Sequence, residues 1–403
     1  MDNGLKVLYQ RDPAFPLASA TLLLGVGSRH ETPAQAGLCS MTIDLLMQGT
    51  RRRTARELAD AMESVGASMG TQVHEDYSEM GFLAPAADLD RAFNVMAEAL
   101  MQPAFPKEEI IKEKAHVLAG LASRRDSIFN VAYDALNRAM YGDHAYGRLV
   151  EGTLKTVRRF RRQDFQAWHR KCAGPGHAIL SIIGPQSPRE AKKILEKRLG
   201  HWRRPFTNVP SPNVLPPAGG RRGDICVRSN FEQAYLMIGY PAPCATDPDH
   251  IPLKVLNTVV GGGMSSRLFS VLREEAGLAY EVSSFYPTRL ETSQWVIYLG
   301  LPKEKLSIAS RRLGELLKQL ADRGPAADEV RQAKAMVRGA FLMDRQSHRR
   351  QAWYQAWWEF LGRGTDYDEK FLEEVDAVTP KQLCDLLRRI LAQPRVTVKV
   401  IPK

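Results

Sequence analysis

"ATLLLGVGS", residues 20–28, is an apolar pattern typical of a buried strand, and an amphipathic helical pattern follows it. The same order returns after "AYLMIGYPA" at 234–242. Each half also ends alike, because a helical pattern precedes the strand pattern "HAILSIIG" (177–184) in the first half and "RVTVKVIP" (395–402) in the second. The front strands are offset by 214 residues, and the closing strands by 217 when position 183 is matched to position 400. We therefore predict two homologous α+β domains.

A segment without apolar periodicity separates the two halves. It runs from 205 to 223, "PFTNVPSPNVLPPAGGRRG", and contains five prolines and three glycines. Such a composition is typical of an interdomain linker. We therefore predict an N-terminal domain at 1–204, a linker at 205–223 and a C-terminal domain at 224–403.

Helical patterns dominate the first half after its opening strands. Thr54 and Glu57 form a capping-box pattern before an amphipathic stretch, and Gly66 stands at a position typical of a C-terminal cap. Residues 87–101 and 106–125 carry further helical periodicity. Several helices in succession after short strands indicate, in each domain, helices layered on one face of a mainly antiparallel sheet.

The composition points to a folded protein in an aqueous compartment. Of the 403 residues, 44% are apolar and 25% are charged. No stretch approaches the roughly 20 apolar residues that a membrane span needs. The opening "MDNGLKVLYQ" lacks the pattern of a signal peptide, which favours the cytoplasm, with the periplasm open if a signal peptide was removed. The five cysteines are scattered and form no C-x-x-C pair, so we expect them to be buried apolar side chains.

The chain is basic, with 56 Lys and Arg against 45 Asp and Glu and a formal net charge of +11. Part of the excess lies in "LKTVRRFRR" at 154–162. Such a run could bind phosphates, but no nucleic-acid motif or aromatic platform accompanies it. We interpret it as the solvated face of a helix or turn and expect neither nucleic acid nor membrane as a partner. The charge also suits acidic peptides.

A series of short motifs extends over nearly the whole chain. They are "NGLKVLYQ", "GSRHETPAQAGL", "MQGT" and "YGDHAYGRLVEGT" in the first half, and "GGGMSSRLFSVLREEAGLAY" and "DAVTPKQL" in the second. In this order and spacing the chain resembles the pitrilysin family, whose members include insulin-degrading enzymes, mitochondrial processing peptidase and two-subunit bacterial peptidases.

Family members that cleave peptides carry H-x-x-E-H on the helix after the "GL" pair, where two His bind zinc and the Glu activates water. The resemblance places Ser40, Ile43 and Asp44 at these positions. The later glutamate ligand falls on Gly120, whereas Glu113 keeps the family's accompanying carboxylate. All three zinc ligands are thus replaced, and the nine His offer no i, i+4 pair instead. We expect no metal in this chain and zinc in a partner subunit.

In the two-subunit bacterial members, the chain without zinc supplies an Arg and a Tyr seven residues apart. The resemblance places them at Arg273 and Tyr280. We expect Ser265 or Ser266 to cap a helix that carries Arg273 in its last turn and stops at Gly277, with Tyr280 opening a strand. A guanidinium can hold a substrate carbonyl and a phenol can donate to an oxyanion. The structural alternative is an Arg that caps helix carbonyls and a Tyr half-buried in a sheet.

Two further segments are candidates for substrate binding. Gly261, Gly262 and Gly263 could let a peptide backbone approach closely, as the glycine-rich loop does in mitochondrial processing peptidase, or could form a tight turn. The stretch 66–73 falls where the family presents an edge strand, although its usual Asn-Ala-x-Thr pattern is missing.

The resemblance favours a zinc-free subunit of a heterodimeric metallopeptidase that acts on unfolded peptides. Its partner would be a homologous H-x-x-E-H subunit, and Arg273 and Tyr280 would act in trans. A second hypothesis is a structural or peptide-binding core subunit without a catalytic role. A third, nucleic-acid binding driven by the net charge of +11, predicts a steep salt dependence.

Overall fold

The computed structural model describes residues 1–203 and 223–403, which form two compact units. Each unit is built from segments that are separated along the chain. Unit 1 consists of Met1–Leu121, Leu149–Pro212 and Asp344–Thr365, and unit 2 of Ala122–Arg148, Asn213–Met343 and Asp366–Lys403. The predicted linker lies outside the described residues except for Gly223, which begins a strand.

Unit 1 contains a five-stranded sheet in the order β1-β5-β2-β4-β3. β1 runs parallel to β5, and the other neighbours are antiparallel. Alternate residues of β4 are buried, as expected for a strand with one face against a helical layer. The strands are β1 (Lys6–Arg11), β2 (Leu17–Leu24), β3 (Ser68–Val73), β4 (Ser78–Pro85) and β5 (Ala178–Gly184).

Unit 2 repeats this topology, with a five-stranded sheet in the order β6-β10-β7-β9-β8. β6 runs parallel to β10, and the other neighbours are antiparallel. The strands that the two patterns predicted at 20–28 and 234–242 are β2 and β7, and each is the central strand of its sheet. The strands are β6 (Gly223–Ser229), β7 (Ala234–Ala242), β8 (Glu281–Phe285), β9 (Ser293–Leu301) and β10 (Val396–Pro402).

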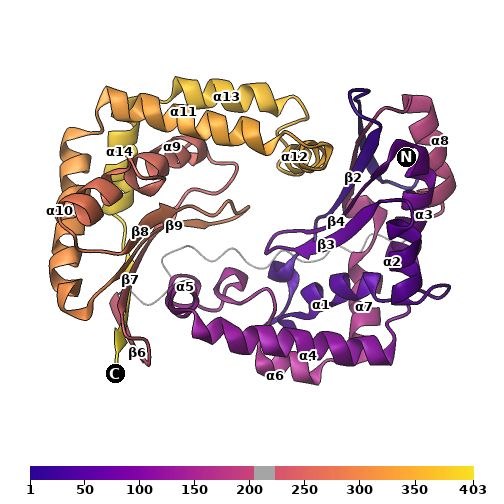
Figure 1. The fold of residues 1–403 in the computed structure, drawn as a ribbon, viewed down its shortest axis with the longest axis horizontal. Helices are drawn as coiled ribbons and strands as arrows, with labels where there is room; N and C mark the ends of the chain where they lie inside the picture. The colour runs from indigo at the N-terminus through magenta and orange to yellow at the C-terminus, as the bar shows by residue number, and fades with distance from the viewer. Residues whose placement is uncertain (204–222) are drawn as a thin grey trace. The chain divides into compact units, whose positions relative to one another are not determined.

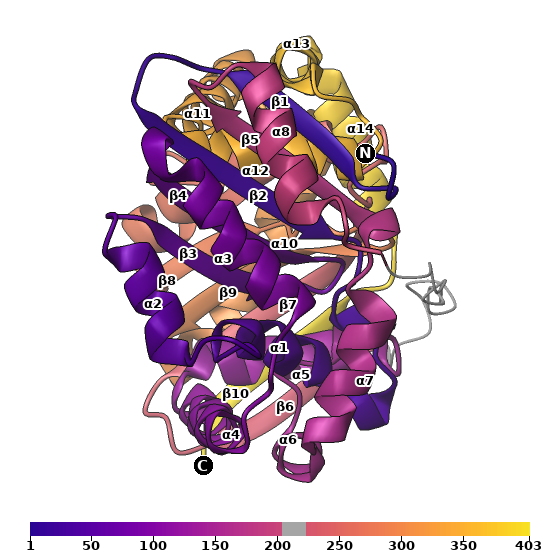
Figure 2. The same cartoon turned by 90° about the vertical axis from the view of Figure 1, so that its right-hand side faces the viewer.

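Helices cover one face of the first sheet, and Figure 2 shows α3 and α8 in front of its strands. Phe82 of β4 meets Phe93 of α3 edge-on, with 4.9 Å between ring centroids. The predicted capping box is confirmed, because the N–H of Glu57 donates to Thr54 Oγ1 and the N–H of Thr54 donates to Glu57 Oε2. The helices are α1 (Leu38–Asp44), α2 (Ala55–Glu63), α3 (Leu89–Met101), α4 (Lys107–Ser123), α6 (Leu154–Arg159), α7 (Arg162–Cys172) and α8 (Pro188–Leu199).

The second sheet is also covered by helices, and Figure 1 shows α9, α10 and α14 on one side of it with α5 on the other. Together with α12 (His348–Phe360), which belongs to unit 1, the remaining helices are α5 (Ile128–Tyr141), α9 (His250–Gly261), α10 (Leu306–Arg323), α11 (Ala327–Asp344), α13 (Tyr367–Ala377) and α14 (Pro380–Leu391).

Each half of the chain contributes one helix to the sheet of the other half. α5 follows the first-half helices but packs on β7 and β10 of unit 2, whereas α12 comes from the second half and packs on β2 and β5 of unit 1. Both contacts are close. A Cβ at Gly239 of β7 would lie 2.5 Å from Met140 Sδ of α5, and Ala352 and Ala356 of α12 are fully buried. The sheets therefore follow the halves of the sequence, and these two helices do not.

The predicted α+β class with two homologous domains and mainly antiparallel sheets is confirmed. Two details differ. Each sheet is mixed, because its first strand runs parallel to its last, and each has a helix on its second face. No helix among residues 1–203 and 223–403 is long and apolar enough to span a membrane.

Two smaller expectations have mixed outcomes. Cys39, Cys172 and Cys384 are buried, but Cys226 is exposed because it lies on the outward face of β6, the edge strand of its sheet. The basic run at 154–162 lies on α6 and the start of α7, and its Arg158 and Arg159 are exposed. These arginines are therefore solvated.

Candidate functional site

A buried carboxylate anchors the start of α1, the helix with the predicted metal positions. Glu31 is 5% exposed and accepts hydrogen bonds from the N–H of Gly37 at 3.1 Å and of Cys39 at 2.5 Å. A negative charge is favourable at a helix N-terminus. Gly37 has a φ of +94°, and a Cβ there would lie 2.5 Å from the carbonyl oxygen of Glu151. The turn at Gly37 therefore requires glycine, and this turn sets where α1 begins.

The predicted metal positions on α1 form a small polar cluster beside β3. Ser40 and Asp44 lie one turn apart, and Ser40 Oγ donates to Asp44 Oδ2 at 3.4 Å. Thr71 of β3 donates from Oγ1 to Asp44 Oδ1 at 3.1 Å. Ile43 is 7% exposed and belongs to the apolar core of unit 1. The position of the general base in active members is thus part of the core.

The helix α4 completes this cluster. Burial raises the pKa of Asp44 most, the Glu113 charge raises it further, and His116 acts in the opposite direction. Gly120 follows Glu113 by two turns and His116 by one, so the three positions share a face of α4. A Cβ at Gly120 would meet no atom within 4 Å, which leaves space beside it.

Two members of the cluster, Thr71 and His116, were not predicted. His116 could have been found from its spacing of three after Glu113 and four before Gly120. Thr71 gave no such signal, because its pairing with Asp44 depends on how β3 lies against α1.

The donors present do not fit zinc. Zinc sites in proteins use about three or four His, Cys, Asp or Glu ligands, and α1 offers a single carboxylate, that of Asp44. Across the described ranges 1–203 and 223–403, no three His, Cys, Asp or Glu side chains are grouped so as to hold a metal ion. No catalytic step on a metal in this chain therefore follows from its residues.

Asp44 makes the stability of unit 1 depend on pH. Burial, with the Glu113 charge as the next cause, raises its pKa to about 6. Between roughly pH 4 and pH 6 the folded chain holds a proton that the unfolded chain has lost, so stability falls as pH rises through this window. We expect Asp44→Asn to change the free energy of unfolding little below about pH 4, and to raise it by about 2–3 kcal/mol above about pH 7.

Urea unfolding at both pH values, followed by circular dichroism, measures this difference. Glu63→Gln serves as a control, because Glu63 is exposed on α2 and the exchange removes one charge in the same way. An equal effect of Asp44→Asn at both pH values would contradict the assignment.

The first residue of the predicted catalytic pair, Arg273, lies on a π-helix, η9 (Phe269–Glu275). The wider turn is marked by the N–H of Ala276, which donates to the carbonyl oxygen of Val271 at 3.3 Å. The segment is thus helical, and its turns are one residue wider than those of an α-helix. Leu272 within it is buried. Arg273 is exposed, and its Cζ lies 4.9 Å from the centroid of the Phe269 ring.

Tyr280 directly precedes β8, the strand against which η9 packs. Its N–H donates to the carbonyl oxygen of Gly300 at 2.9 Å, which ties its backbone to β9. The side chain is 67% exposed. Tyr280 therefore has a fixed backbone and a phenol in solvent.

The three glycines lie where α9 ends against β8. A Cβ at Gly261 would lie 2.5 Å from the backbone nitrogen of Ser284, and one at Gly262 would lie 2.6 Å from the Cα of Thr258. Packing inside unit 2 thus requires glycine at both positions. At Gly263 the nearest atom is the flexible methyl of Met336, at 2.9 Å.

The segment 66–73 contains β3, which pairs with β4 and is the last strand of its sheet. Its counterpart in unit 2 is β8, which pairs with β9 and lies just after Tyr280. Thr71 places the predicted edge strand next to the Asp44 cluster.

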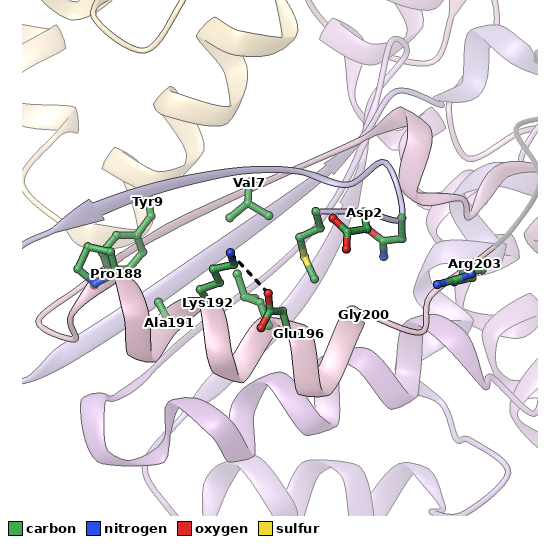
Figure 3. Close-up of a pocket in the computed structure, with 12 residues that line it drawn as sticks. Asp2, Val7, Tyr9, Pro188, Ala191, Lys192, Glu196, Gly200 and Arg203 are labelled. Atoms are coloured by element: carbon green, nitrogen blue, oxygen red, sulfur yellow. Dashed lines mark ion pairs between the residues drawn. The ribbon is translucent and has the colours of Figure 1, made fainter.

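A pocket of about 480 Å³ in unit 1 lies between α8 and β1 (Figure 3). Its walls carry two acidic side chains, Asp2 and Glu196, and two basic ones, Lys192 and Arg203. Lys192 pairs with Glu196 at 3.7 Å. None of the predicted site residues lines this pocket.

Two family profiles match most of the chain. Residues 6–154 match the insulinase profile of peptidase family M16, and residues 159–337 match the profile described as the peptidase M16 inactive domain. The chain belongs to peptidase family M16. The family resemblance expected from the motifs is thereby confirmed.

The relatives of this M16 chain include proteins named as zinc proteases. It is 26% identical over 405 residues to the uncharacterized zinc protease YmxG of Bacillus subtilis, covering 99% of this chain and 97% of the relative. It is 28% identical over 349 residues to the uncharacterized zinc protease SCO5738 of Streptomyces coelicolor, covering 85% of this chain and 76% of the relative.

Solved structures share the fold of this M16 chain. A peptidase M16 inactive domain from Pseudomonas fluorescens superposes with a TM-score of 0.92 at 22% identity, covering 100% of this chain and 97% of the other. A protease from Helicobacter pylori superposes with a TM-score of 0.91 at 19% identity, covering 99% and 97%. Because the sequence identities are only 22% and 19%, these two comparisons show a shared fold and nothing about activity.

Proposed function

We propose that this M16 chain is the zinc-free subunit of a heterodimeric metallopeptidase. The observation that carries the proposal is the contrast between two sites. The zinc positions hold Ser40, Ile43, Asp44 and Gly120, which cannot replace the usual ligands, whereas the Arg and Tyr positions keep both functional groups in solvent. Zinc would then be held by a homologous H-x-x-E-H partner.

In this proposal each of the two exposed side chains has a separate role. The Arg273 guanidinium holds a carbonyl oxygen of the peptide through its fork of N–H donors. The Tyr280 hydroxyl donates a hydrogen bond to the oxyanion that forms when water attacks the scissile carbonyl. The backbone bond from Tyr280 to Gly300 supports this role, because a fixed donor need not reorganise during the reaction.

The substrate class in the proposal is an unfolded peptide. β3 ends its sheet, and an extended peptide can add to such an edge through main-chain hydrogen bonds. Gly263 would be the open part of the glycine loop, since its only close neighbour is the end of a flexible Met side chain. Gly261 and Gly262 would support the loop through their packing.

Reconstitution with a partner tests the proposal. This chain, an H-x-x-E-H subunit and their mixture are each assayed with unfolded peptides, and the zinc content of each is measured. We expect zinc in the partner and hydrolysis by the mixture only. Zinc-dependent hydrolysis by this chain alone would refute the proposal.

The structural-subunit hypothesis predicts a different result. If this chain only supports the fold of its partner, the mixture is active and removing the Arg273 or Tyr280 side-chain function changes nothing. The exposure of both groups favours the catalytic proposal, because exposed donors are accessible to a peptide even though Arg273 also stacks on Phe269.

A further inference from the structure

The pocket between α8 and β1 lies along an edge strand of unit 1, because β1 is the first strand of its sheet. Its volume of about 480 Å³ is within the range of ligand sites. Val7 of β1 and Ala191 and Leu195 of α8 form its apolar part, and Figure 3 shows Val7 between the strand and the helix. β3 is at the opposite end of the sheet, so this pocket is separate from the predicted substrate edge.

Hydrogen bonds fix both ends of the pocket. At one end Asn3 Nδ2 donates to the carbonyl oxygens of Leu199 at 2.8 Å and of Trp202 at 3.1 Å, which ties the start of the chain to the end of α8. At the other end the Tyr9 hydroxyl donates to the carbonyl oxygen of Gln186, shortly before α8 begins. The fold therefore sets the distance between strand and helix before any ligand binds.

The backbone of β1 has an unpaired edge. The N–H of Asp12, one residue past the strand, donates to the carbonyl oxygen of Gly184 of β5 at 2.9 Å. Successive residues of a strand turn their N–H and C=O groups to opposite sides, so the even-numbered residues of β1 face β5 and Val7 and Tyr9 face outward. Outside the ladder with β5, the described part of the chain provides no hydrogen bond to the backbone of Val7 or Tyr9.

The start of the chain uses part of this edge itself. Leu5 is the outward-facing residue before Val7. Its carbonyl oxygen accepts from the N-terminal ammonium of Met1 at 3.0 Å, and its N–H donates to Asn3 Oδ1 at 3.2 Å. The outward groups of Leu5 are thus satisfied, and those of the next two outward residues are left for a further strand.

We infer that the pocket between α8 and β1 binds an extended peptide segment of another protein, which adds to β1 as a further strand. Val7 and Tyr9 supply main-chain hydrogen bonds, and every second side chain of the peptide is apolar and enters the pocket beside Ala191 and Leu195. The linker of this chain suits the role poorly, because five of its first 13 residues are prolines, which lack an N–H. The inference goes beyond the proposed peptidase role and does not depend on it.

Calorimetric titration of the full chain with a peptide of alternating Thr and Val, blocked at both ends and about seven residues long, tests the inference. We expect saturation below about 1 mM. A peptide with Ser in place of Val should bind at least about tenfold more weakly, because it has no apolar side chain for the pocket.

Two N-methylated forms of the peptide test the main-chain pairing. One is methylated on the Val amides and the other on the Thr amides. Only every second N–H of an added strand faces β1, so one form should lose at least about tenfold in affinity and the other should keep it. Loss with methylated Val indicates an antiparallel peptide, and loss with methylated Thr a parallel one.

Hydrogen exchange at single amides locates the bound peptide. The N–H groups of Val7 and Tyr9 should exchange more slowly in the complex, whereas that of Leu8 should be slow with or without peptide, because it faces β5. Ala191→Phe fills the pocket and should weaken binding at least about tenfold. Lys193→Phe is the matched control, since Lys193 is exposed on the same helix and does not line the pocket.

Three results would overturn the inference. They are an equal effect of both N-methylated forms, slowed exchange only in another segment, and an equal loss of affinity in the Lys193→Phe control. A dimer in sedimentation that Ala191→Phe dissociates would also overturn it, because the occupant of the edge would then be a second copy of this chain. The N-methylated peptides need no variant, so the test holds if Ala191→Phe does not fold.

Discussion

Tyr280→Phe is expected to lower the kcat of the assembled peptidase about 10²- to 10³-fold. The exchange removes only the hydroxyl, and a single donor to the oxyanion contributes on this scale because the charge it stabilises appears in the transition state. KM should change little, since the ground-state peptide does not need this donor. Steady-state kinetics with one peptide substrate measures both parameters.

The fold should tolerate this change. The Tyr280 side chain is 67% exposed, and the backbone bond to Gly300 does not involve the phenol. Tyr298→Phe is a matched control on the adjacent strand β9, because it removes a hydroxyl from the same sheet without touching the proposed site. Full activity in both variants would leave the structural-subunit hypothesis standing.

Arg273→Ala provides the companion measurement. We expect a higher KM, because the guanidinium is proposed to hold the substrate before the reaction begins. Arg312→Ala removes another exposed positive charge, from α10, and should leave KM unchanged. Identical values for both variants would show that Arg273 contributes only general charge.

Restoring the missing ligands is expected to create a zinc site. We predict that the combination Ser40→His, Ile43→Glu, Asp44→His and Gly120→Glu binds zinc at least about 10³-fold more tightly than the unchanged chain. The first and third changes place two His one turn apart on α1. The fourth places a carboxylate on the α4 face that also carries Glu113, where a Cβ has at least 4 Å of free space.

Zinc retained after dialysis, measured by mass spectrometry, should approach about one ion per chain. The matched control omits Gly120→Glu and should bind at least about 10- to 100-fold more weakly, since it lacks one ligand. Glu in place of Ile43, which is 7% exposed, should destabilise the metal-free chain, and zinc should restore the stability by binding the folded state. A folded variant without tight zinc would show that α1 and α4 do not form the expected site.

Several features of this protein could be predicted because they depend on local patterns. Unbroken or alternating runs of apolar residues predict the strands β2 and β7. The same patterns predict the repeat between the two halves. The capping box at Thr54 follows from residue types three positions apart. The replaced ligand positions can be read from the chain, because a missing His is visible without any structure.

Other features depend on contacts between distant segments. Thr71 reaches Asp44 from another element, and the charge of Glu113 acts on Asp44 from α4. The π-helix at Arg273, which contains buried Leu272 and packs against β8, has no clear local signature.

The amino-acid sequence by itself determined that the chain has two α+β halves, that α1 lacks zinc ligands, and that an Arg and a Tyr stand seven residues apart in the second half. Only the tertiary structure decided that α5 and α12 each pack on the sheet of the other half, and that Asp44 is half-buried beside Thr71 and near the Glu113 charge. The physical reason is that the spacing of apolar residues specifies which face of a helix is buried. The partner of that face is chosen by shape and volume across the whole fold, such as the space that Gly239 leaves for Met140.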